Sequence, residues 1–389
     1  MLQRLLTAIA GIAAIAALGG LAYYGLCLWG AYSYLRSRRR ALPADSSTLP
    51  PVSILKPLKG VDPEIYESFR SHCLLNYPQY EIIFGVSEAE DPAVAEVRRL
   101  QREFPNRAIQ LVVCRQKLGT NVKVSNLVQM LSVARFNHLL VNDSDIRVDP
   151  NYLRRVMSPL LRPEVGMVTC LYRGVPSSTL GSRLESLGIS TDFSGGVLAA
   201  RRLEKGMRFG LGSTLAFRRA DLESVGGFQS LLDYLADDYE LGKRIADLGK
   251  SVELSEEVVE TFLPPYDFRA YFEHQLRWAR SVRDSRRWGY VGVLFTFGLP
   301  WALLALVASR GALWAWALTI AVSVARIAVA LMVGETVLRD QYVRPLLPLV
   351  LLRDLSAAAV WMASFASDRI AWRGDYFHLK DGKLARIER

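Results

Sequence analysis

The sequence predicts an α/β protein in which a parallel β-sheet domain lies between apolar segments near both ends of the chain. Two observations predict this fold class. In the middle of the chain, short apolar, β-branched runs alternate with amphipathic helical stretches. Near both ends, long runs carry no charge. The 389 residues, of which 51% are hydrophobic and 22% charged, suffice for one such domain and a membrane part.

The first element is an apolar run from Leu5 to Leu35 that contains no charged residue. It exceeds the roughly 20 residues that a helix needs to cross a bilayer. Four arginines follow it within residues 36–40, whereas a signal peptide carries its charges before the apolar run. We therefore expect a transmembrane signal anchor over 5–35 and a basic juxtamembrane linker over 36–50. By the positive-inside rule, the domain after this linker is expected in the cytoplasm.

The middle of the chain alternates strands and helices, which indicates a parallel sheet covered on both faces within a catalytic domain of residues 51–266. The predicted strands are 52–58, 80–87, 109–114, 138–142 and 165–172, and the predicted helices are 63–75, 92–104, 122–134 and 152–161. Residues 193–206 show no clear period, and we expect a flexible, basic loop there.

The last third of the chain predicts membrane association. An amphipathic, interfacial helix is expected over 267–287, followed by membrane segments over 288–367. The third of these segments, 345–367, carries Arg353 and Asp354 in its middle, which is costly in lipid, so we expect it to be re-entrant or interfacial. The tail, 368–389, is expected in the cytoplasm.

The composition also excludes several classes of protein. Four scattered cysteines provide neither a disulfide framework nor a zinc motif and fit a reducing compartment. No glycine-rich dinucleotide fingerprint or P-loop occurs, which argues against a dehydrogenase and an NTPase. The net charge of +10 requires no nucleic-acid partner, because a basic surface facing anionic lipid explains it.

Charged residues come directly after the predicted strands. Parallel sheets bind ligands at the carboxyl ends of their strands, and those positions hold Asp62, Asp91, Lys123, Asp143 and Asp145. The D-S-D pair would reach one divalent cation if its two carboxylates alternated along a strand end. The alternative is a turn closed by aspartate hydrogen bonds. Acids at three strand ends and lysines at a fourth favour a site for Mg²⁺ or Mn²⁺ and a phosphorylated ligand.

Two adjacent aspartates, Asp237 and Asp238, stand where a helix is expected to begin. A helix N-terminus favours acids, which explains one aspartate more readily than two. The helix cap and a catalytic role both remain open on this pattern alone.

Four motifs in order resemble the ceramide glucosyltransferases and their bacterial relatives, which include hopanoid glycosyltransferases. They are KPLKGVDP (56–63), NDSDIRV (142–148), LADDYELG (235–242) and HQLRWARS (274–281). The resemblance covers about residues 50–290 and includes the arrangement of the membrane segments. It implies the GT-A nucleotide-sugar fold, Rossmann-like in its sheet, and an inverting glycosyltransferase.

The resemblance also implies roles for individual residues. Asp62, Asp91 and Lys123 would lie by the donor, and Asp143 with Asp145 would hold Mg²⁺ or Mn²⁺ and the diphosphate. Asp238 would be the catalytic base. The residues placed near the acceptor or the diphosphate are Asp237, His274, Gln275, Arg277 and Trp278. Polysaccharide synthases carry Gln-x-x-Arg-Trp, whereas His274 stands at the first position here, which favours a single transfer over polymer synthesis.

The sequence thus predicts an integral membrane enzyme, with its catalytic domain on the cytoplasmic face, of a bacterial inner membrane. It would transfer glucose from UDP-glucose to ceramide. Transfer of N-acetylglucosamine from its UDP-sugar to a hopanoid polyol is the nearest alternative. A non-catalytic membrane scaffold is the alternative from another class, and a transporter is disfavoured because the few spans show no repeat. The expected partners are a UDP-sugar, a lipid acceptor and the bilayer.

Overall fold

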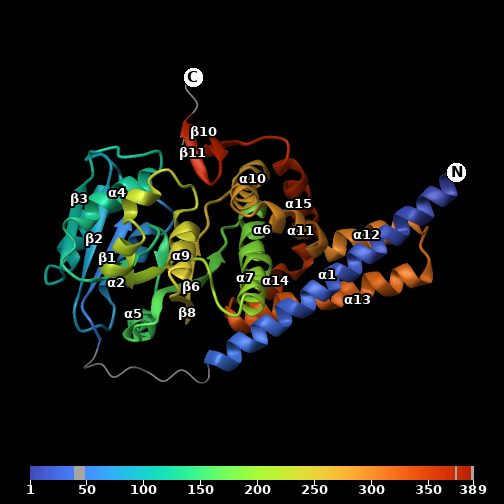
Figure 1. The fold of residues 1–389 in the computed structure, drawn as a ribbon, viewed down its shortest axis with the longest axis horizontal. Helices are drawn as coiled ribbons and strands as arrows, with labels where there is room; N and C mark the ends of the chain where they lie inside the picture. Colours follow the sequence, from blue (N-terminus) through green and yellow to red (C-terminus); the bar gives the residue numbers. More distant parts are fainter. Residues whose placement is uncertain (39–48, 373–374, 387–389) are drawn as a thin grey trace. The chain divides into compact units, whose positions relative to one another are not determined.

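The computed structural model describes residues 1–38, 49–372 and 375–386, which divide between two compact units (Figure 1). The helical unit comprises Met1–Arg39, Pro176–Leu203 and Pro265–Asp381. The sheet unit comprises Arg40–Val175, Glu204–Pro264 and Gly382–Arg389. Most of the predicted linker over 36–50 lies outside the described residues.

The sheet unit is built on eight strands in the order β3-β2-β1-β4-β7-β6-β8-β5. They are β1 (Val52–Pro57), β2 (Tyr80–Val86), β3 (Ile109–Val113), β4 (His138–Val141), β5 (Ile146–Arg147), β6 (Val165–Val175), β7 (Leu215–Arg218) and β8 (Ser251–Phe262). The pairs of β1 with β2 and β4, and of β2 with β3, are parallel as predicted. The sheet is mixed, however, because β7 pairs antiparallel with both β4 and β6, and β5 with β8.

Helices cover both faces of the parallel half of this sheet. They include α2 (Ile65–Cys73), α3 (Ala93–Glu103), α4 (Val122–Leu131) and α5 (Tyr152–Met157), followed by η2 (Ser158–Leu161). Buried residues of α2, α3 and α5 form one apolar core with alternate residues of β1 and β2. On the other face α4 packs closely on β2, because a Cβ added to Gly85 would lie 2.3 Å from Sδ of Met130. The unit is completed by α8 (Arg219–Ser224), η4 (Phe228–Leu231) and α9 (Asp237–Asp247).

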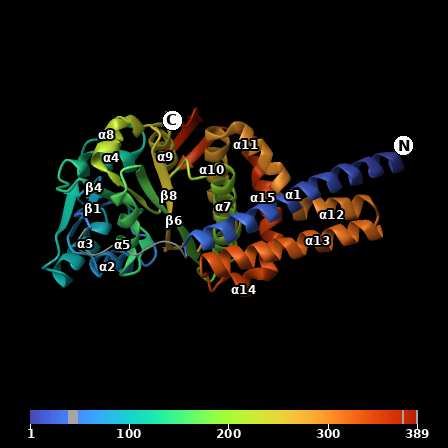
Figure 2. The same cartoon turned by 60° about the horizontal axis from the view of Figure 1, so that its bottom comes forward.

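The helical unit begins with α1 (Leu2–Arg38), and α12 and α13 run alongside it in both views (Figures 1 and 2). Its other helices are α6 (Leu180–Gly188), η3 (Ile189–Phe193), α7 (Ser194–Leu203), α10 (Phe268–Ser285), α11 (Arg287–Gly292), η5 (Val293–Thr296), α12 (Gly298–Ala308), α13 (Leu313–Val329), η6 (Ala330–Val337), α14 (Val343–Leu346), η7 (Leu347–Leu349) and α15 (Val350–Ser364). Close packing of α1 on α12 requires glycine, since a Cβ on Gly20 would lie 2.3 Å from Cα of Gly298.

Three described helices are long and apolar enough to cross a membrane: Leu2–Ser37, Leu313–Val337 and Val343–Ser364. A fourth span is present if Arg287–Thr296 and Gly298–Ala308, which meet at an angle of 53°, count as one bent helix. These segments coincide with the predicted ones. Whether the last of them spans or re-enters stays a prediction.

Three features differ from the sequence-based expectations. Residues 193–206 are largely helical, in η3 and α7, rather than a flexible loop. The stretch Pro176–Leu203, expected inside the catalytic domain, packs in the helical unit. The expected tail contains the strands β9 (Arg369–Trp372), β10 (Asp375–Lys380) and β11 (Lys383–Arg386), of which β9 and β10 pair antiparallel.

Candidate active site

The loops after β1, β2 and β4 meet at the carboxyl ends of these neighbouring parallel strands. Both oxygens of the Asp91 carboxylate accept from the backbone N–H of Gly60, at 3.1 and 3.0 Å, and Asp91 also accepts from the N–H of Ala93 at the start of α3. Ser144 donates its hydroxyl to Asp62 at 2.5 Å. The predicted residues Asp62 and Asp91 therefore fix the loops that border the site.

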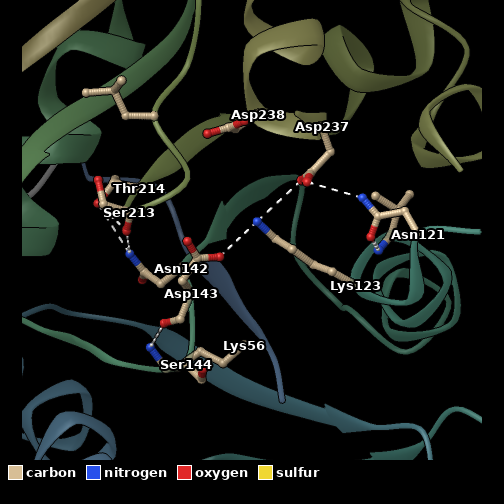
Figure 3. Close-up of polar contacts among 12 residues, drawn as sticks. Lys56, Asn121, Lys123, Asn142, Asp143, Ser144, Ser213, Thr214, Asp237 and Asp238 are labelled. Atoms are coloured by element: carbon tan, nitrogen blue, oxygen red, sulfur yellow. Dashed lines mark hydrogen bonds and ion pairs between the residues drawn. The ribbon is translucent and has the colours of Figure 1, made fainter. Parts of the chain in front are cut away.

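Lys123 lies between two carboxylates that come from different parts of the chain (Figure 3). Its Nζ is 2.8 Å from Oδ1 of Asp143 and 3.4 Å from Oδ2 of Asp237. Burial alone would lower the pKa of Lys123, but the carboxylates of Asp143, Asp237 and Asp238 outweigh it and raise that pKa well above the ordinary value. Lys123 is therefore a permanent cation in an acidic cluster.

The opening residues of α9 are the adjacent aspartates. Asp237 is buried, its Oδ1 lies 3.4 Å from Nδ2 of Asn121, and burial raises its pKa. Asp238 accepts at Oδ1 from the N–H of Tyr239 at 2.8 Å. Burial, and then the neighbouring Asp237 carboxylate, raise the pKa of Asp238 to about 6. At neutral pH Asp238 is thus ionised and more basic than an ordinary aspartate.

Gly212 brings the aspartate of the expected metal motif and the expected base to one place. A Cβ added to Gly212 would lie 2.9 Å from Oδ2 of Asp143 and 3.1 Å from Oδ2 of Asp238. The two carboxylates therefore flank the same small volume, which the absence of a side chain keeps open. The sequence did not predict this juxtaposition.

Two further residues of the site were missed. Lys56, fully buried at the end of β1, donates its Nζ to the backbone carbonyl of Asp143 at 2.9 Å. Burial lowers the pKa of Lys56 to about 7, against the opposing effect of the nearby carboxylates. Asn142 donates from Nδ2 to the carbonyl of Ser213 at 2.6 Å and to the hydroxyl of Tyr152 at 3.0 Å. Both stood inside quoted motifs, but their roles depend on contacts distant in sequence.

The D-S-D segment adopts a turn at Ser144 and Asp145, so strand alternation does not apply to it. Asp143 contacts Lys123, whereas Asp145 accepts a hydrogen bond from Thr261. Burial, and then the Asp143 carboxylate, raise the pKa of Asp145 to about 6. The two carboxylates therefore have separate partners.

These residues nevertheless fit a metal that arrives with a diphosphate. Within the described ranges, no group of three or more histidine, cysteine, aspartate or glutamate side chains could hold a metal. Mg²⁺ needs only one or two carboxylates when phosphates and waters supply the other oxygens. Asp143, whose side chain is 40% exposed, meets that requirement.

The loops that carry Lys123 and the aspartate pair are braced against each other and against the C-terminal segment. The N–H of Asn121 donates to the carbonyl of Leu232 at 2.8 Å, and Nδ2 of Asn121 donates to that of Tyr234 at 2.8 Å. The N–H of Leu235 donates to the carbonyl of Gly382 at 3.0 Å. The segment before α9 is thereby held on two sides.

The four predicted residues of the H-Q-L-R-W motif lie on α10 of the helical unit. Nδ1 of His274 is 2.9 Å from Oε1 of the buried Glu185, and its ring stacks on Tyr266 with centroids 5.4 Å apart. The Trp278 ring lies 5.3 Å from that of His274. The assignment of His274, Gln275, Arg277 and Trp278 to the acceptor or the diphosphate stays a prediction.

The chain is similar in sequence to known glycosyltransferases. The family model described as Glycosyl transferase family 21 matches residues 12–385. The chain is 24% identical over 251 residues to ceramide glucosyltransferase 3 of Caenorhabditis elegans, covering 64% of this chain and 54% of that protein. It is 31% identical over 134 residues to the ceramide glucosyltransferase of Komagataella phaffii, covering 32% and 25%. The chain spans about half the length of the first relatives it matches.

A solved structure confirms the fold. A mannosyltransferase from Pyrobaculum calidifontis, in complex with GDP-Man and Mn²⁺, aligns with 93% of this chain and 99% of its own at a TM-score of 0.52 and 20% identity. This likeness concerns the fold alone, which is the predicted GT-A fold. Together with the apolar helices, the relatives indicate a membrane protein.

Proposed function

Because the chain belongs to glycosyl transferase family 21, we propose that it transfers a single sugar from a UDP-sugar to a hydroxyl of a membrane lipid. Glucose and ceramide are the preferred pair, in keeping with the names of the relatives. The observation that carries the proposal is the approach of Asp143 and Asp238 around Gly212, beside the Lys123 ammonium. That arrangement combines a cationic and metal-compatible surface for a diphosphate with a base for a hydroxyl.

Asp238 is the proposed general base. It takes the proton of the acceptor hydroxyl as the oxygen attacks the anomeric carbon, and the sugar–diphosphate bond breaks on the opposite side, which inverts the configuration. A pKa of about 6 keeps Asp238 ionised at neutral pH while strengthening its basicity. Asp237, held by Lys123 and Asn121, keeps the start of α9 in place.

The leaving diphosphate carries negative charge that must be stabilised. Lys123 is a buried cation beside Asp143 and is suited to contact a phosphate oxygen. A bound Mg²⁺ or Mn²⁺, held by Asp143 and with Asp145 as the second candidate, would supply Lewis-acid stabilisation of the diphosphate. Asp62 and Asp91 shape the donor side by fixing the loops after β1 and β2.

The acceptor side is assigned to the H-Q-L-R-W motif of α10. Arg277 has the guanidinium geometry that suits phosphate oxygens, and Trp278 offers a flat ring to a sugar or a lipid. An amphipathic helix bearing these residues suits catalysis at a membrane surface, where a lipid acceptor enters. His274 in place of glutamine favours one transfer over polymer synthesis.

The proposal is tested with the full chain reconstituted in lipid nanodiscs. UDP-glucose and a short-chain ceramide are expected to yield UDP and a β-glucosylceramide, whose anomeric configuration NMR reports. Product from UDP-N-acetylglucosamine and a hopanoid polyol instead would replace the substrate pair and keep the reaction class. No UDP release from any UDP-sugar, with or without lipid, would contradict the enzyme and favour a membrane scaffold.

A cytoplasmic location of residues 41–287 is part of the proposal and rests on the arginines after the first apolar run. Nucleotide sugars are made in the cytosol, so the donor site must face it. A topology reporter fused after Asp45 is expected to read as cytoplasmic, and an extracytoplasmic reading would contradict this location.

A further inference from the structure

The C-terminal ends of α1 and α7 carry an exposed patch of aromatic and basic side chains. Trp29, Tyr32 and Arg36 follow one another at intervals of three and four residues, so they share one face of α1. All three are exposed, Trp29 by 51% and Tyr32 by 56%. We define the basic–aromatic patch as these three residues together with Arg202 and Leu203 of α7.

The two helix ends pack against each other within the helical unit. A Cβ on Gly30 of α1 would lie 2.5 Å from the carbonyl oxygen of Leu198, so glycine allows the close approach of α7. One turn further along α7, the guanidinium carbon of Arg202 lies 3.9 Å from the centroid of the Trp29 ring. A cation over the face of an indole is attracted by the ring. Trp29 and Arg202 therefore belong to one surface, although they are distant in sequence.

The patch carries positive charge that its own helices do not balance. Neither α1 nor α7 contains an aspartate or a glutamate. Directly after α7, Glu204 is followed by Lys205, so this pair adds no net charge. The nearest acid before α7 in the sequence is Asp192, on η3.

Asp192 belongs to a separate group whose charges balance. It accepts from Nη2 of Arg326 at 2.6 Å and lies 3.2 Å from Nη2 of Arg353. Asp354 lies 2.9 Å from Nη2 of Arg326. Two arginines and two aspartates thus compensate one another, and Asp192 is not available to the patch. The arginines of the patch therefore attract negative charge from the surroundings.

Two pairs of exposed aromatic residues mark opposite ends of the apolar bundle. Trp29 and Tyr32 lie at one end. Trp314 and Trp316 stand at the start of α13, at the end where α12 and α13 are connected (Figures 1 and 2). Tryptophan and tyrosine are enriched at both interfaces between a membrane and water. The patch thus occupies a position where one interface is expected.

The separation of the two aromatic pairs agrees with the thickness of a bilayer. Gly20 packs against Gly298 at the start of α12, and the hydroxyl of Thr319 on α13 donates to the carbonyl of Ala302 at 3.3 Å. These contacts fix the register of α1, α12 and α13. Counted from them at a rise of about 1.5 Å per residue, the two pairs lie about 28 Å apart along the bundle. The hydrocarbon core of a bilayer is about 30 Å thick, so the patch lies at the level of the lipid head groups.

Charge and depth together select the partner of the patch. A guanidinium pairs with two phosphate oxygens at once, and anionic lipids attract every additional arginine near their surface. Trp29, Tyr32 and Leu203 suit the boundary between head groups and acyl chains, since each presents an apolar surface there. A lipid whose head group carries a net negative charge satisfies both requirements.

We propose that the basic–aromatic patch binds the head groups of anionic phospholipids and thereby holds the end of α7 at the membrane surface. This inference goes beyond the proposed function, because it concerns neither the sugar donor nor the acceptor. It holds whether or not the chain transfers a sugar.

The test measures the local lipid composition at Leu203, with the full chain reconstituted in nanodiscs of phosphatidylcholine and phosphatidylglycerol. Leu203 is 66% exposed and the four natural cysteines are buried, so Leu203→Cys provides a selectively reactive thiol for an NBD fluorophore. Nitroxide-labelled phosphatidylglycerol should quench this fluorophore several-fold more than nitroxide-labelled phosphatidylcholine at equal content. A nitroxide near the head group should quench more than one deep in the acyl chain.

Substitutions of single arginines identify the cause of the preference. Arg36→Gln and Arg202→Gln should each lower the preference for phosphatidylglycerol by up to about fivefold, the effect of one arginine near an anionic surface. The double variant should show no preference, whereas Arg202→Lys keeps the charge and should retain it. Arg310→Gln is the matched control, because Arg310 is exposed at the opposite end of the bundle, and it should leave the preference unchanged.

Equal quenching by the two lipids in the chain with all its arginines would overturn the proposal, and so would an unchanged preference in the double variant. Stronger quenching by the deep nitroxide would also overturn it, because the patch would then lie below the head groups. Absence of quenching by either lipid would overturn it in favour of a protein partner on this face. Sugar transfer, measured on the same samples, tests the proposed function separately, so either proposal can fail while the other stands.

Discussion

Two groups of buried charges, one in each unit, differ in how they are balanced. In the sheet unit, Asp143, Asp237 and Asp238 surround the ammonium of Lys123. In the helical unit, two guanidinium groups face two carboxylates. The first group carries excess negative charge, which a bound metal ion would offset in the proposed function. The second is neutral as it stands, and among the described residues some of its atoms have no hydrogen-bond partner.

This difference indicates what each group can be used for. Excess acid raises the proton affinity of one carboxylate and attracts a metal or a cationic partner, both of which serve chemistry. A balanced group contributes to the packing of helices as long as both of its signs are present. Five experiments test this division, beginning with the largest expected effect.

The first change is Asp238→Asn, which keeps the shape of the side chain and removes the base. Sugar transfer should fall by about 10²–10⁴-fold, the usual contribution of a positioned general base, while UDP-sugar affinity stays near that of the wild type. Asp237→Asn is the neighbouring control and should impair the chemical step less. Single-turnover rates and equilibrium donor binding provide the measurement. Wild-type turnover in Asp238→Asn, or a loss confined to donor binding, would mean that Asp237 and Asp238 serve only to stabilise the start of the helix.

The second change, Arg326→Met, removes one of the two cations from the balanced group of the helical unit. It leaves Asp354 and Asp192 without their shared cation, and breaking a buried pair from one side costs about 3–5 kcal/mol. The thermal unfolding midpoint in detergent should therefore drop by many degrees. Arg310→Met, at an exposed arginine, should leave the midpoint unchanged. Equal midpoints for the two variants would mean that the helical unit does not depend on its charge balance.

The third change is metal removal from the acid-rich group. Excess EDTA should reduce transfer by about 10²-fold, because a bound cation is worth several kcal/mol to a leaving diphosphate. Mn²⁺ added back in excess should restore the rate. Asp143→Ala should weaken donor binding, and Asp145→Ala should be milder, since Asp145 is hydrogen-bonded to Thr261. Full activity in EDTA would mean that Lys123 alone balances the diphosphate.

The fourth test varies pH. Asp238 must be ionised to act as a base, and its pKa is raised to about 6. The transfer rate should therefore fall about tenfold per pH unit below that value. Asp237→Asn removes a carboxylate that raises this pKa, so the acid limb of the profile should move to lower pH. Asp145→Asn should leave the limb in place. A flat profile between pH 5 and pH 7 would contradict the base assignment.

The fifth change is Gly212→Ala. The added Cβ would intrude on the Asp143 and Asp238 carboxylates at 2.9 and 3.1 Å, so both must shift by a few tenths of an ångström. Displacement of reacting groups is costly, and transfer should fall by about tenfold or more. Gly25→Ala is the control, because a Cβ there meets nothing within 4 Å. Undiminished transfer in Gly212→Ala would mean that the reaction does not take place between the Asp143 and Asp238 carboxylates.

The sequence predicted the parallel half of the sheet closely, because β1 to β4 and their helices follow local apolar periodicity. It did not predict β7 inserted antiparallel between β4 and β6, since such pairing depends on contacts distant in sequence. Nor did it predict α7. Its residues were expected in a flexible loop, whereas Gly195 and Gly196 lie where α1 packs, near Sγ of Cys27 and the hydroxyl of Tyr23.

The residues of the candidate site likewise divide into those that the sequence predicted and those that it did not. Its acids could be identified because aspartates at strand ends stand out in a short motif. Lys56, Asn121 and Gly212 could not, since a buried lysine, a helix cap and a glycine acquire roles only when three loops meet. The turn at Asp145 was the less favoured of two alternatives, because a D-x-D pattern is compatible with both an extended and a turned backbone.

The bond between Leu235 and Gly382 has a practical consequence for handling the protein. Gly382 takes a positive φ of 79°, Lys383 lies over the Tyr234 ring at 5.3 Å, and the N–H of Leu384 donates to the carbonyl of Asp233 at 2.7 Å. The short C-terminal strand β11 thus contacts the residues just before the proposed base. Deleting the chain from Gly382 onward would leave every proposed catalytic side chain in place yet loosen the turn from which Asp238 projects. Affinity tags and fluorescent fusions therefore belong at the N-terminus, and loss of activity in a C-terminally shortened enzyme should not be attributed to a missing catalytic group.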